Sequence, residues 1–202
     1  NEQSLRVVET LENGVGLNLT WEVRDGILNH RTATCPRTLE GAAVRIADKI
    51  AYINHDIDDA VRAGLLSEDD LPVESLELFG KGHGVRINAM ILDVVGESMG
   101  QPFVRMTAKG QSVTGALREY LFRNLYRDPR ALEQEKKAES VLKKLFSHYM
   151  EHPEALPAEF LAIVERDSLE RAVCDYIAGM SDQYAIQKFM ALCVPSPTPA
   201  AR

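Results

Sequence analysis

The stretch from residue 38 to residue 64, TLEGAAVRIADKIAYINHDIDDAVRAG, constrains the fold more than any other part of the chain. At 100° per residue, its ionisable side chains fall on one side of a helix and its aliphatic side chains on the opposite side. The ionisable side comprises Arg45, Asp48, Tyr52, His55, Asp56 and Asp59, and the aliphatic side comprises Leu39, Ala43, Ile46, Ile50, Ile53, Ile57 and Val61. Thr38 suits the N-cap and Gly64 suits the position after the last turn, which predicts a helix of about 25 residues and about 37 Å. Such a helix can cross a small domain with one face in the core.

The rest of the chain also has helical periodicity, and no run alternates with the period of two that a sheet needs. Residues 103–106 are the only strand candidate. Asp128 followed by Pro129 is typical of a helix start, and Gly179 and Ser181 predict a break in the last helical stretch. We therefore expect an all-α protein with one region over residues 1–128, a second over 129–194 and a Pro-rich, disordered tail over 195–202.

The composition narrows the class of protein. The chain has 202 residues, of which 45% are hydrophobic and 26% are charged, as is usual for a globular domain. No apolar run reaches the ~20 residues that span a bilayer, and residues 1–10 lack a signal-peptide layout, so we expect a cytoplasmic protein without a membrane segment. The net charge of −7 argues against general affinity for nucleic acid, although a local basic groove is compatible with it. The three widely spaced cysteines predict reduced thiols.

The ionisable side of the long helix has two interpretations. A solvated charged face is the ordinary explanation for such a run. However, Asp48, Tyr52 and Asp56 follow one another at i, i+4 and i+8 and so form one ridge, on a helix apolar enough to be buried in a bundle. A buried carboxylate needs a metal or hydrogen-bond donors, so a functional ridge is the alternative.

Other motifs point less clearly to chemistry. The segment FGKGHGVR, residues 79–86, lacks the spacing of a phosphate-binding Walker loop and predicts a flexible loop. His148 and His152 have the i, i+4 spacing of a zinc pair, but no Glu follows His148 as the HExxH motif requires. The Lys and Arg residues between Arg118 and Lys144 form either a solvated helix face or an anion-facing wall.

Taken together, four segments resemble the deoxynucleoside triphosphate triphosphohydrolases of the HD superfamily, the dGTPase-like proteins. The segments are NEQSLRVVE, LTWEVRDGILNH, the stretch 38–64 and DYIAGMSDQYAIQKF. The resemblance implies an HD-domain-like helical bundle, with residues 1–128 as the C-terminal portion of the catalytic domain and 129–194 as a helical extension. It also implies a divalent cation of Mg, Mn or Fe/Zn type, with Asp48 as its last ligand. The family's upstream His and His-Asp doublet are expected before Asn1, because His55-Asp56 follows Asp48 and is in the wrong order.

The resemblance also assigns residues to the substrate. Asp48, Lys49, Tyr52 and Asp56 match the family pattern Asp-Lys-x-x-Tyr-x-x-x-Asp. It gives Lys49 a phosphate contact, Tyr52 packing against the deoxyribose, and Asp56 a hydrogen bond to the 3′-hydroxyl. A ring packed where a 2′-hydroxyl would stand favours a deoxy sugar, and a carboxylate is a good acceptor for the 3′-hydroxyl. A second pattern, Arg-x7-Tyr, is matched by Arg118, which would bind the terminal phosphates, and Tyr126, which would contact the sugar or base.

The activity that the resemblance implies is metal-dependent hydrolysis of deoxynucleoside triphosphates, dGTP among them, to a deoxynucleoside and inorganic triphosphate. The catalytic acid and base are expected upstream of Asn1, so no residue of this chain is assigned to either role. Homo-oligomers are expected from the family. Two alternatives remain open: a nucleotide-binding, regulatory or oligomerisation module without catalysis, and single-stranded nucleic-acid binding through the basic residues.

Overall fold

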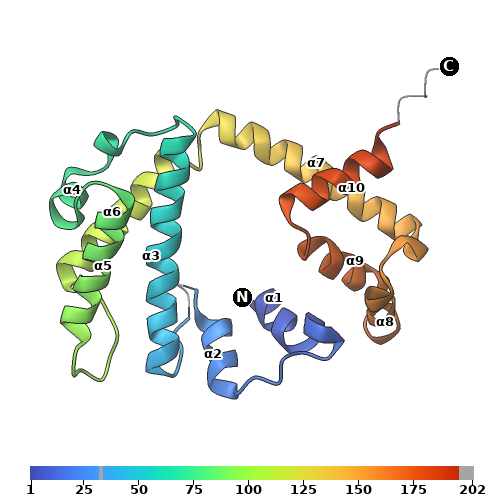
Figure 1. The fold of residues 1–202 in the computed structure, drawn as a ribbon, viewed down its shortest axis with the longest axis horizontal. Coiled ribbons are helices and arrows are strands. Elements are labelled where there is room, and N and C mark those ends of the chain that lie inside the picture. Colours follow the sequence, from blue (N-terminus) through green and yellow to red (C-terminus); the bar gives the residue numbers. More distant parts are fainter. Residues whose placement is uncertain (32–33, 196–202) are drawn as a thin grey trace. The chain divides into compact units, whose positions relative to one another are not determined.

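The computed structural model describes residues 1–31 and 34–195, and within these ranges the protein contains helices and no strand (Figure 1). The predicted all-α class is therefore confirmed. The chain forms two compact units, residues 1–128 and residues 129–202, and each is described by itself. Within the same described ranges, no helix is both long enough and apolar enough to cross a membrane.

The first unit begins with short helical pieces. Helix α1 (Glu2–Arg6) continues into a π-helical segment (Val7–Leu11) and a 3-10 turn (Glu12–Gly14). Helix α2 (Trp21–Asn29) follows and packs against α3. These two helices approach closely at two glycines, because a Cβ atom on Gly41 would lie 3.4 Å from the Cα atom of Gly26. Small residues at this crossing thus bring α2 next to α3.

Helix α3 (Leu39–Arg62) is the predicted long helix. The Thr38 hydroxyl accepts a hydrogen bond from the Gly41 amide at 3.0 Å, and Gly64 has a φ of 66°, a left-handed conformation that suits glycine at a helix C-terminus. Ile50, Ile53 and Ile57 are buried, as the aliphatic side predicts. The cap and the end of this helix are confirmed, and its buried face is confirmed from Ile50 to Ile57, whereas Leu39 and Ala43 of the predicted aliphatic side are exposed.

The segment between α3 and residue 124 is more helical than predicted. After a 3-10 turn (Glu68–Asp70) come α4 (Val73–Phe79), α5 (His83–Ser98) and α6 (Ala108–Asn124). Helix α4 was not predicted, and α5 begins inside the glycine-rich segment that the sequence suggests is a loop. The strand suggested for residues 103–106 is also wrong, because nothing among the described residues pairs with this segment. The Thr107 side chain caps α6 by accepting from the Gly110 amide at 3.0 Å.

The core of the first unit is formed by side chains of α3, α4, α5 and α6 and of the segments that lead into α4 and α6. Its buried members are Ile50, Ile53, Ile57, Leu71, Phe79, Met90, Met106, Val113, Leu117 and Leu121. Next to these, a fully buried arginine, Arg86 of α5, donates from Nε to the Oδ1 atom of buried Asn54 on α3 at 2.7 Å. Its Nη1 atom lies 3.6 Å from Glu68, whose carboxylate also accepts from the Gly82 amide at 2.6 Å. A polar cluster thus ties α5 to α3.

The second unit contains α7 (Pro129–Glu151), a 3-10 turn (Pro153–Ala155), α8 (Ala158–Arg166), α9 (Leu169–Ala178) and α10 (Asp182–Cys193). The break between α9 and α10 lies where it was predicted, and the Ser181 hydroxyl caps α10 by accepting from the Tyr184 amide at 3.3 Å. The core is centred on Leu145, Tyr149, Val173 and Tyr176. Of the predicted disordered tail, residues 196–202 lie outside the described residues. Cys35, Cys174 and Cys193 are free.

Candidate functional site

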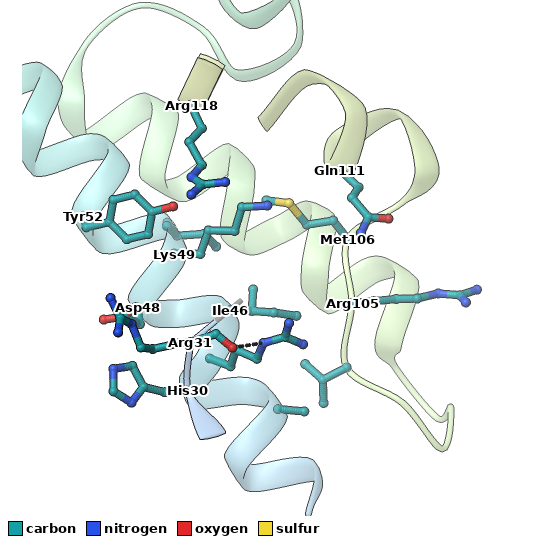
Figure 2. A pocket seen from close by; sticks show the side chains of 14 residues that line it. His30, Arg31, Ile46, Asp48, Lys49, Tyr52, Arg105, Met106, Gln111 and Arg118 are labelled. Atoms are coloured by element: carbon teal, nitrogen blue, oxygen red, sulfur yellow. Dashed lines mark hydrogen bonds between the residues drawn. The ribbon is translucent and has the colours of Figure 1, made fainter. Parts of the chain in front are cut away.

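A cavity of about 470 Å³ opens beside the ionisable side of α3 (Figure 2). Asp48, Lys49 and Tyr52 line it from α3, and Arg118 lines it from α6, with the Arg118 guanidinium lying near the ring of Tyr52 in Figure 2. The remaining described residues that line it are His30, Arg31, Ala42, Arg45, Ile46, Ile50, Val104, Arg105, Met106 and Gln111. Four residues predicted from the sequence therefore meet in one cavity.

A second cavity, of about 560 Å³, shares part of its wall with the first. Its described lining residues are Tyr52, Gly115, Arg118, Glu119, Phe122 and Tyr126. Because Tyr52 and Arg118 line both cavities, the two spaces adjoin at these side chains. The first has a cationic lining and the second an aromatic one. We refer to them below as the cationic cavity and the aromatic cavity.

Asp56 and Tyr126 contact each other directly. The Tyr126 hydroxyl donates a hydrogen bond to the Asp56 carboxylate, although 70 positions separate the two residues. Burial and this carboxylate raise the pKa of the Tyr126 phenol well above its usual range, so the hydroxyl stays protonated and donates near neutral pH. Tyr126 lies two residues beyond the last residue of α6, and the hydrogen bond holds this end of α6 against the ridge of α3.

Positive charge predominates in the cationic cavity. Arg31, Arg45, Lys49, Arg105 and Arg118 are its described cations, and Asp48 is the carboxylate among its described residues. Arg105 pairs with Glu97 at 2.9 Å, which partly neutralises it. Burial lowers the pKa of Lys49, and the neighbouring Arg118 and Arg45 lower it further. Like charges held this close are stabilised by a bound anion, so the cavity suits a polyanionic group.

Tyr52 lies at the junction of the two cavities and is half-buried. Burial raises the pKa of its phenol, Arg118 opposes this rise, and Asp48 and Asp56 add to it. The side chain is therefore a neutral ring surrounded by charged groups. It can pack against an apolar surface of a ligand while Lys49 and Arg118 contact an anionic part of the same ligand.

Asp48 is the one expected metal ligand in this chain, and it is exposed at the cationic cavity. Among residues 1–31 and 34–195, no three His, Cys, Asp or Glu side chains gather as a metal site would require. Asp48 therefore supplies at most one ligand, and the described residues do not form a metal centre by themselves. His55, which precedes Asp56 but was not predicted to be the family's His-Asp doublet, does not line the cationic cavity. Its ring contacts the ring of His83, with the two ring centroids 5.2 Å apart.

Two further candidate motifs remain: the pair of His148 and His152 lies in the second unit, and the basic residues between Arg118 and Lys144 extend into it. The rings of His148 and His152 are 4.9 Å apart, and His152 also contacts the Glu154 carboxylate at 3.2 Å. On α7, Lys137 pairs with Glu133 at 2.8 Å and Lys143 pairs with Glu139 at 2.6 Å. These exposed pairs favour a solvated helix face over an anion-facing wall for this part of the basic residues.

Sequence reasoning missed several residues of this region. Arg31, Gln111 and Phe122 line the cavities from loop or helix positions whose spacing carries no signal. Asn54 could have been found, because its position on a helical wheel falls next to the aliphatic side of α3, where a polar residue needs a partner. Its partner, Arg86, lies 32 residues away and has no such signal.

Comparison with known proteins supports the family that the sequence suggests. The phosphohydrolase-associated domain matches residues 104–191. Over 98% of its length, the chain is 50% identical to a deoxyguanosinetriphosphate triphosphohydrolase-like protein of Caldanaerobacter subterraneus subsp. tengcongensis, of which it covers 58%. Proteins of the same name from Clostridium perfringens and Desulfatibacillum aliphaticivorans are 42% and 37% identical, over 96% and 98% of this chain and 60% and 62% of their own.

The chain thus spans about three fifths of the length of the relatives that it matches. Within this span the similarity includes both units, so it covers the helix α3 with its ridge as well as the second unit. The matched domain and these relatives support a deoxyguanosinetriphosphate triphosphohydrolase-like protein of the HD superfamily.

Proposed function

We propose that this chain forms the nucleotide-binding part of an enzyme that hydrolyses deoxynucleoside triphosphates, such as dGTP, to a deoxynucleoside and inorganic triphosphate. The observation that carries the proposal is the pair of adjoining cavities, one cationic and one aromatic, which meet at Tyr52 and Arg118. A nucleoside triphosphate has two matching parts, a polyanion and a nucleoside whose flat base can stack on aromatic rings. The names of the relatives support the same substrate class.

In this proposal the chain binds and orients the substrate. Lys49 and Arg118 neutralise the phosphates, and charge-assisted hydrogen bonds of this kind hold the chain of phosphates in one direction. Tyr52 packs against the deoxyribose at the junction, where a 2′-hydroxyl would meet the ring. Asp56 accepts from the 3′-hydroxyl with one oxygen while Tyr126 donates to its carboxylate.

The reaction consumes one water. Water adds to the α-phosphorus, the bond from that phosphorus to the 5′-oxygen breaks, and the 5′-oxygen takes a proton to give the deoxynucleoside. The remaining product is inorganic triphosphate. A divalent cation is part of the proposal, with Asp48 as one of its ligands, and the general acid and base are expected outside these 202 residues.

A second candidate is a module that binds nucleotides, or mediates regulation or assembly, without catalysis. It needs no complete metal centre, and the described residues alone do not gather three metal ligands. One assay distinguishes the two candidates. It measures the release of triphosphate by the full-length protein from each of the four deoxynucleoside triphosphates and the four ribonucleoside triphosphates, with Mg²⁺ or Mn²⁺. The enzyme releases triphosphate from the deoxy substrates in preference to the ribo forms. Saturable binding without release from any of them supports the module instead.

A further inference from the structure

The cationic cavity carries more positive charge than the contacts assigned to the substrate use. Lys49 and Arg118 are assigned to the phosphates, and their side chains reach into the cavity from α3 and α6 (Figure 2). Arg31 and Arg45 line the same cavity without an assigned contact. Burial lowers the pKa of Lys49, as do the cations Arg118 and Arg45, and no described carboxylate is among the groups that shift it. The cavity therefore favours the bound group that has the most negative charge.

The aromatic cavity offers a nucleoside mostly uncharged contacts. Phe122 and Tyr126 are partly exposed there, and the Asp56 carboxylate already accepts from the Tyr126 hydroxyl. The Glu119 carboxylate that lines this cavity is paired with Arg123. A deoxynucleoside has no charge, so stacking and the hydrogen bond of its 3′-hydroxyl hold it, whereas several charge-assisted contacts hold a phosphate chain. Most of the affinity for a nucleotide therefore comes from its phosphates.

Hydrolysis increases the negative charge of the group in the cationic cavity. In the proposed reaction the α-phosphorus gains the oxygen of water and loses its bond to the 5′-oxygen, which takes a proton and leaves with the uncharged deoxynucleoside. The α-phosphate becomes a terminal phosphate, so fully ionised inorganic triphosphate has one more negative charge than the substrate, and one proton is released. Lys49 and Arg118 then hold the product at least as strongly as they hold the same phosphates in the substrate.

We propose that the deoxynucleoside leaves first, and that inorganic triphosphate stays in the cationic cavity until its slow departure, which limits turnover. This inference rests on the proposed function and adds the order of product release to it. Accumulated triphosphate would occupy the site of the next substrate molecule. The reaction that consumes this product must therefore be a hydrolysis of phosphoanhydride bonds by another enzyme, which converts triphosphate and water to pyrophosphate and phosphate.

The first test is product inhibition of the full-length protein with dGTP, at a Mn²⁺ concentration above that of all phosphate species. Inorganic triphosphate should compete with dGTP, with an inhibition constant no larger than the KM. Deoxyguanosine should inhibit noncompetitively, because it binds the complex that still holds triphosphate, with a constant roughly 100-fold higher or more. Sodium chloride at equal ionic strength is the control for screening.

The outcomes separate the release order from the proposed function. Hydrolysis of dGTP with competitive inhibition by deoxyguanosine, or with noncompetitive inhibition by triphosphate, contradicts the release order alone. Absence of hydrolysis with all four deoxynucleoside triphosphates contradicts the proposed function, and the release order with it.

The second test is rapid quenching of the reaction within the first turnover. Wild type should form a burst of one deoxyguanosine per active site and then continue at a slower, steady rate. Arg31→Gln removes an exposed cation of the cavity, so it should raise the inhibition constant of triphosphate roughly tenfold and increase kcat. Lys109→Gln, exposed on α6 outside both cavities, should change neither. Absence of a burst in wild type, or a lower kcat in Arg31→Gln, overturns the proposal.

Discussion

The hydroxyl of Tyr126 donates to the carboxylate of Asp56, and this hydrogen bond joins the end of α6 to the ridge of α3. Tyr126 lines the aromatic cavity with Tyr52, so the hydrogen bond ties the Asp56 carboxylate to the wall of that cavity. The carboxylate that is proposed to hold the 3′-hydroxyl is therefore positioned by a residue that lines the space proposed for the nucleoside.

Tyr126→Phe removes this hydrogen bond and keeps the ring. The loss of about 1 to 1.5 kcal/mol in the free energy of substrate binding corresponds to roughly a tenfold rise in the KM for dGTP. The kcat should change less than twofold, because the hydrogen bond orients the substrate and touches no reacting atom. Steady-state kinetics of the full-length protein checks this. Phe122→Leu, on the same cavity wall but without a hydroxyl, is a control for packing alone, and an unchanged KM in Tyr126→Phe would remove the role assigned to the hydrogen bond.

Lys49→Gln and Arg118→Gln each remove one cation from the cationic cavity. Hydrogen bonds to charged groups contribute about 1.5 to 3 kcal/mol, so each variant should weaken the binding of inorganic triphosphate by roughly 10- to 100-fold. Isothermal titration calorimetry at low and high salt measures the loss, and both variants should show a shallower salt dependence than wild type. Lys109→Gln on exposed α6 surface is the matched control. Equal affinity in all four proteins would contradict an anion site at this cavity.

The buried pair of Arg86 and Asn54 should be coupled in stability. Replacing Arg86 by Met leaves the Asn54 amide oxygen without its donor and separates Glu68 from its cation, at a cost of about 3 kcal/mol in the free energy of unfolding. Urea unfolding of Arg86→Met, Asn54→Ala and the double variant gives the coupling energy, expected at about 1 to 3 kcal/mol. Additive effects would mean that each side chain acts on its own.

Gly41→Ala should destabilise the contact between α2 and α3. Its Cβ atom would lie 2.6 Å from the Cβ atom of Pro36, in the segment that joins α2 to α3, and 3.4 Å from the Cα atom of Gly26, so this segment must shift, at a cost of about 1 to 3 kcal/mol. Gly115→Ala is the contrasting substitution, because its Cβ atom would meet nothing within 4 Å and alanine favours the helix by about 0.5 to 1 kcal/mol. Thermal unfolding of both variants distinguishes them, and equal melting temperatures would argue against a close approach at Gly41.

Much of the architecture could be predicted because its signals are local. The cap at Thr38, the left-handed Gly64 and the aliphatic side of α3 depend on residues within one helix, and periodicity suffices to find them. The break at Ser181 has a local signal of the same kind. Helix α4 escaped prediction because it is seven residues long, too short for the periodicity to stand out beside Pro72 and Gly80.

The candidate site was only partly predictable for a different reason. Asp48, Tyr52 and Asp56 share one ridge, so a helical wheel brings them together, but nothing local brings Tyr126 to Asp56 or Arg86 to Asn54. Those contacts depend on how α5 and α6 pack against α3, which follows from the fit of buried side chains over the whole unit. The Arg-x7-Tyr pattern suggested Tyr126 through the family resemblance, whereas Arg86 had no pattern to suggest it.

The most direct measurement of the central claim is the amount of inorganic triphosphate that the full-length protein releases from dGTP in the presence of Mn²⁺, with wild type and Asp48→Asn compared side by side. Asp48→Asn keeps the size and shape of the side chain and removes the charge that the proposed cation requires. The account predicts one triphosphate for each deoxyguanosine formed by wild type, loss of that release in Asp48→Asn, and binding of dGTP retained through Lys49 and Arg118. Release of phosphate or pyrophosphate instead, or full activity in Asp48→Asn, would contradict it.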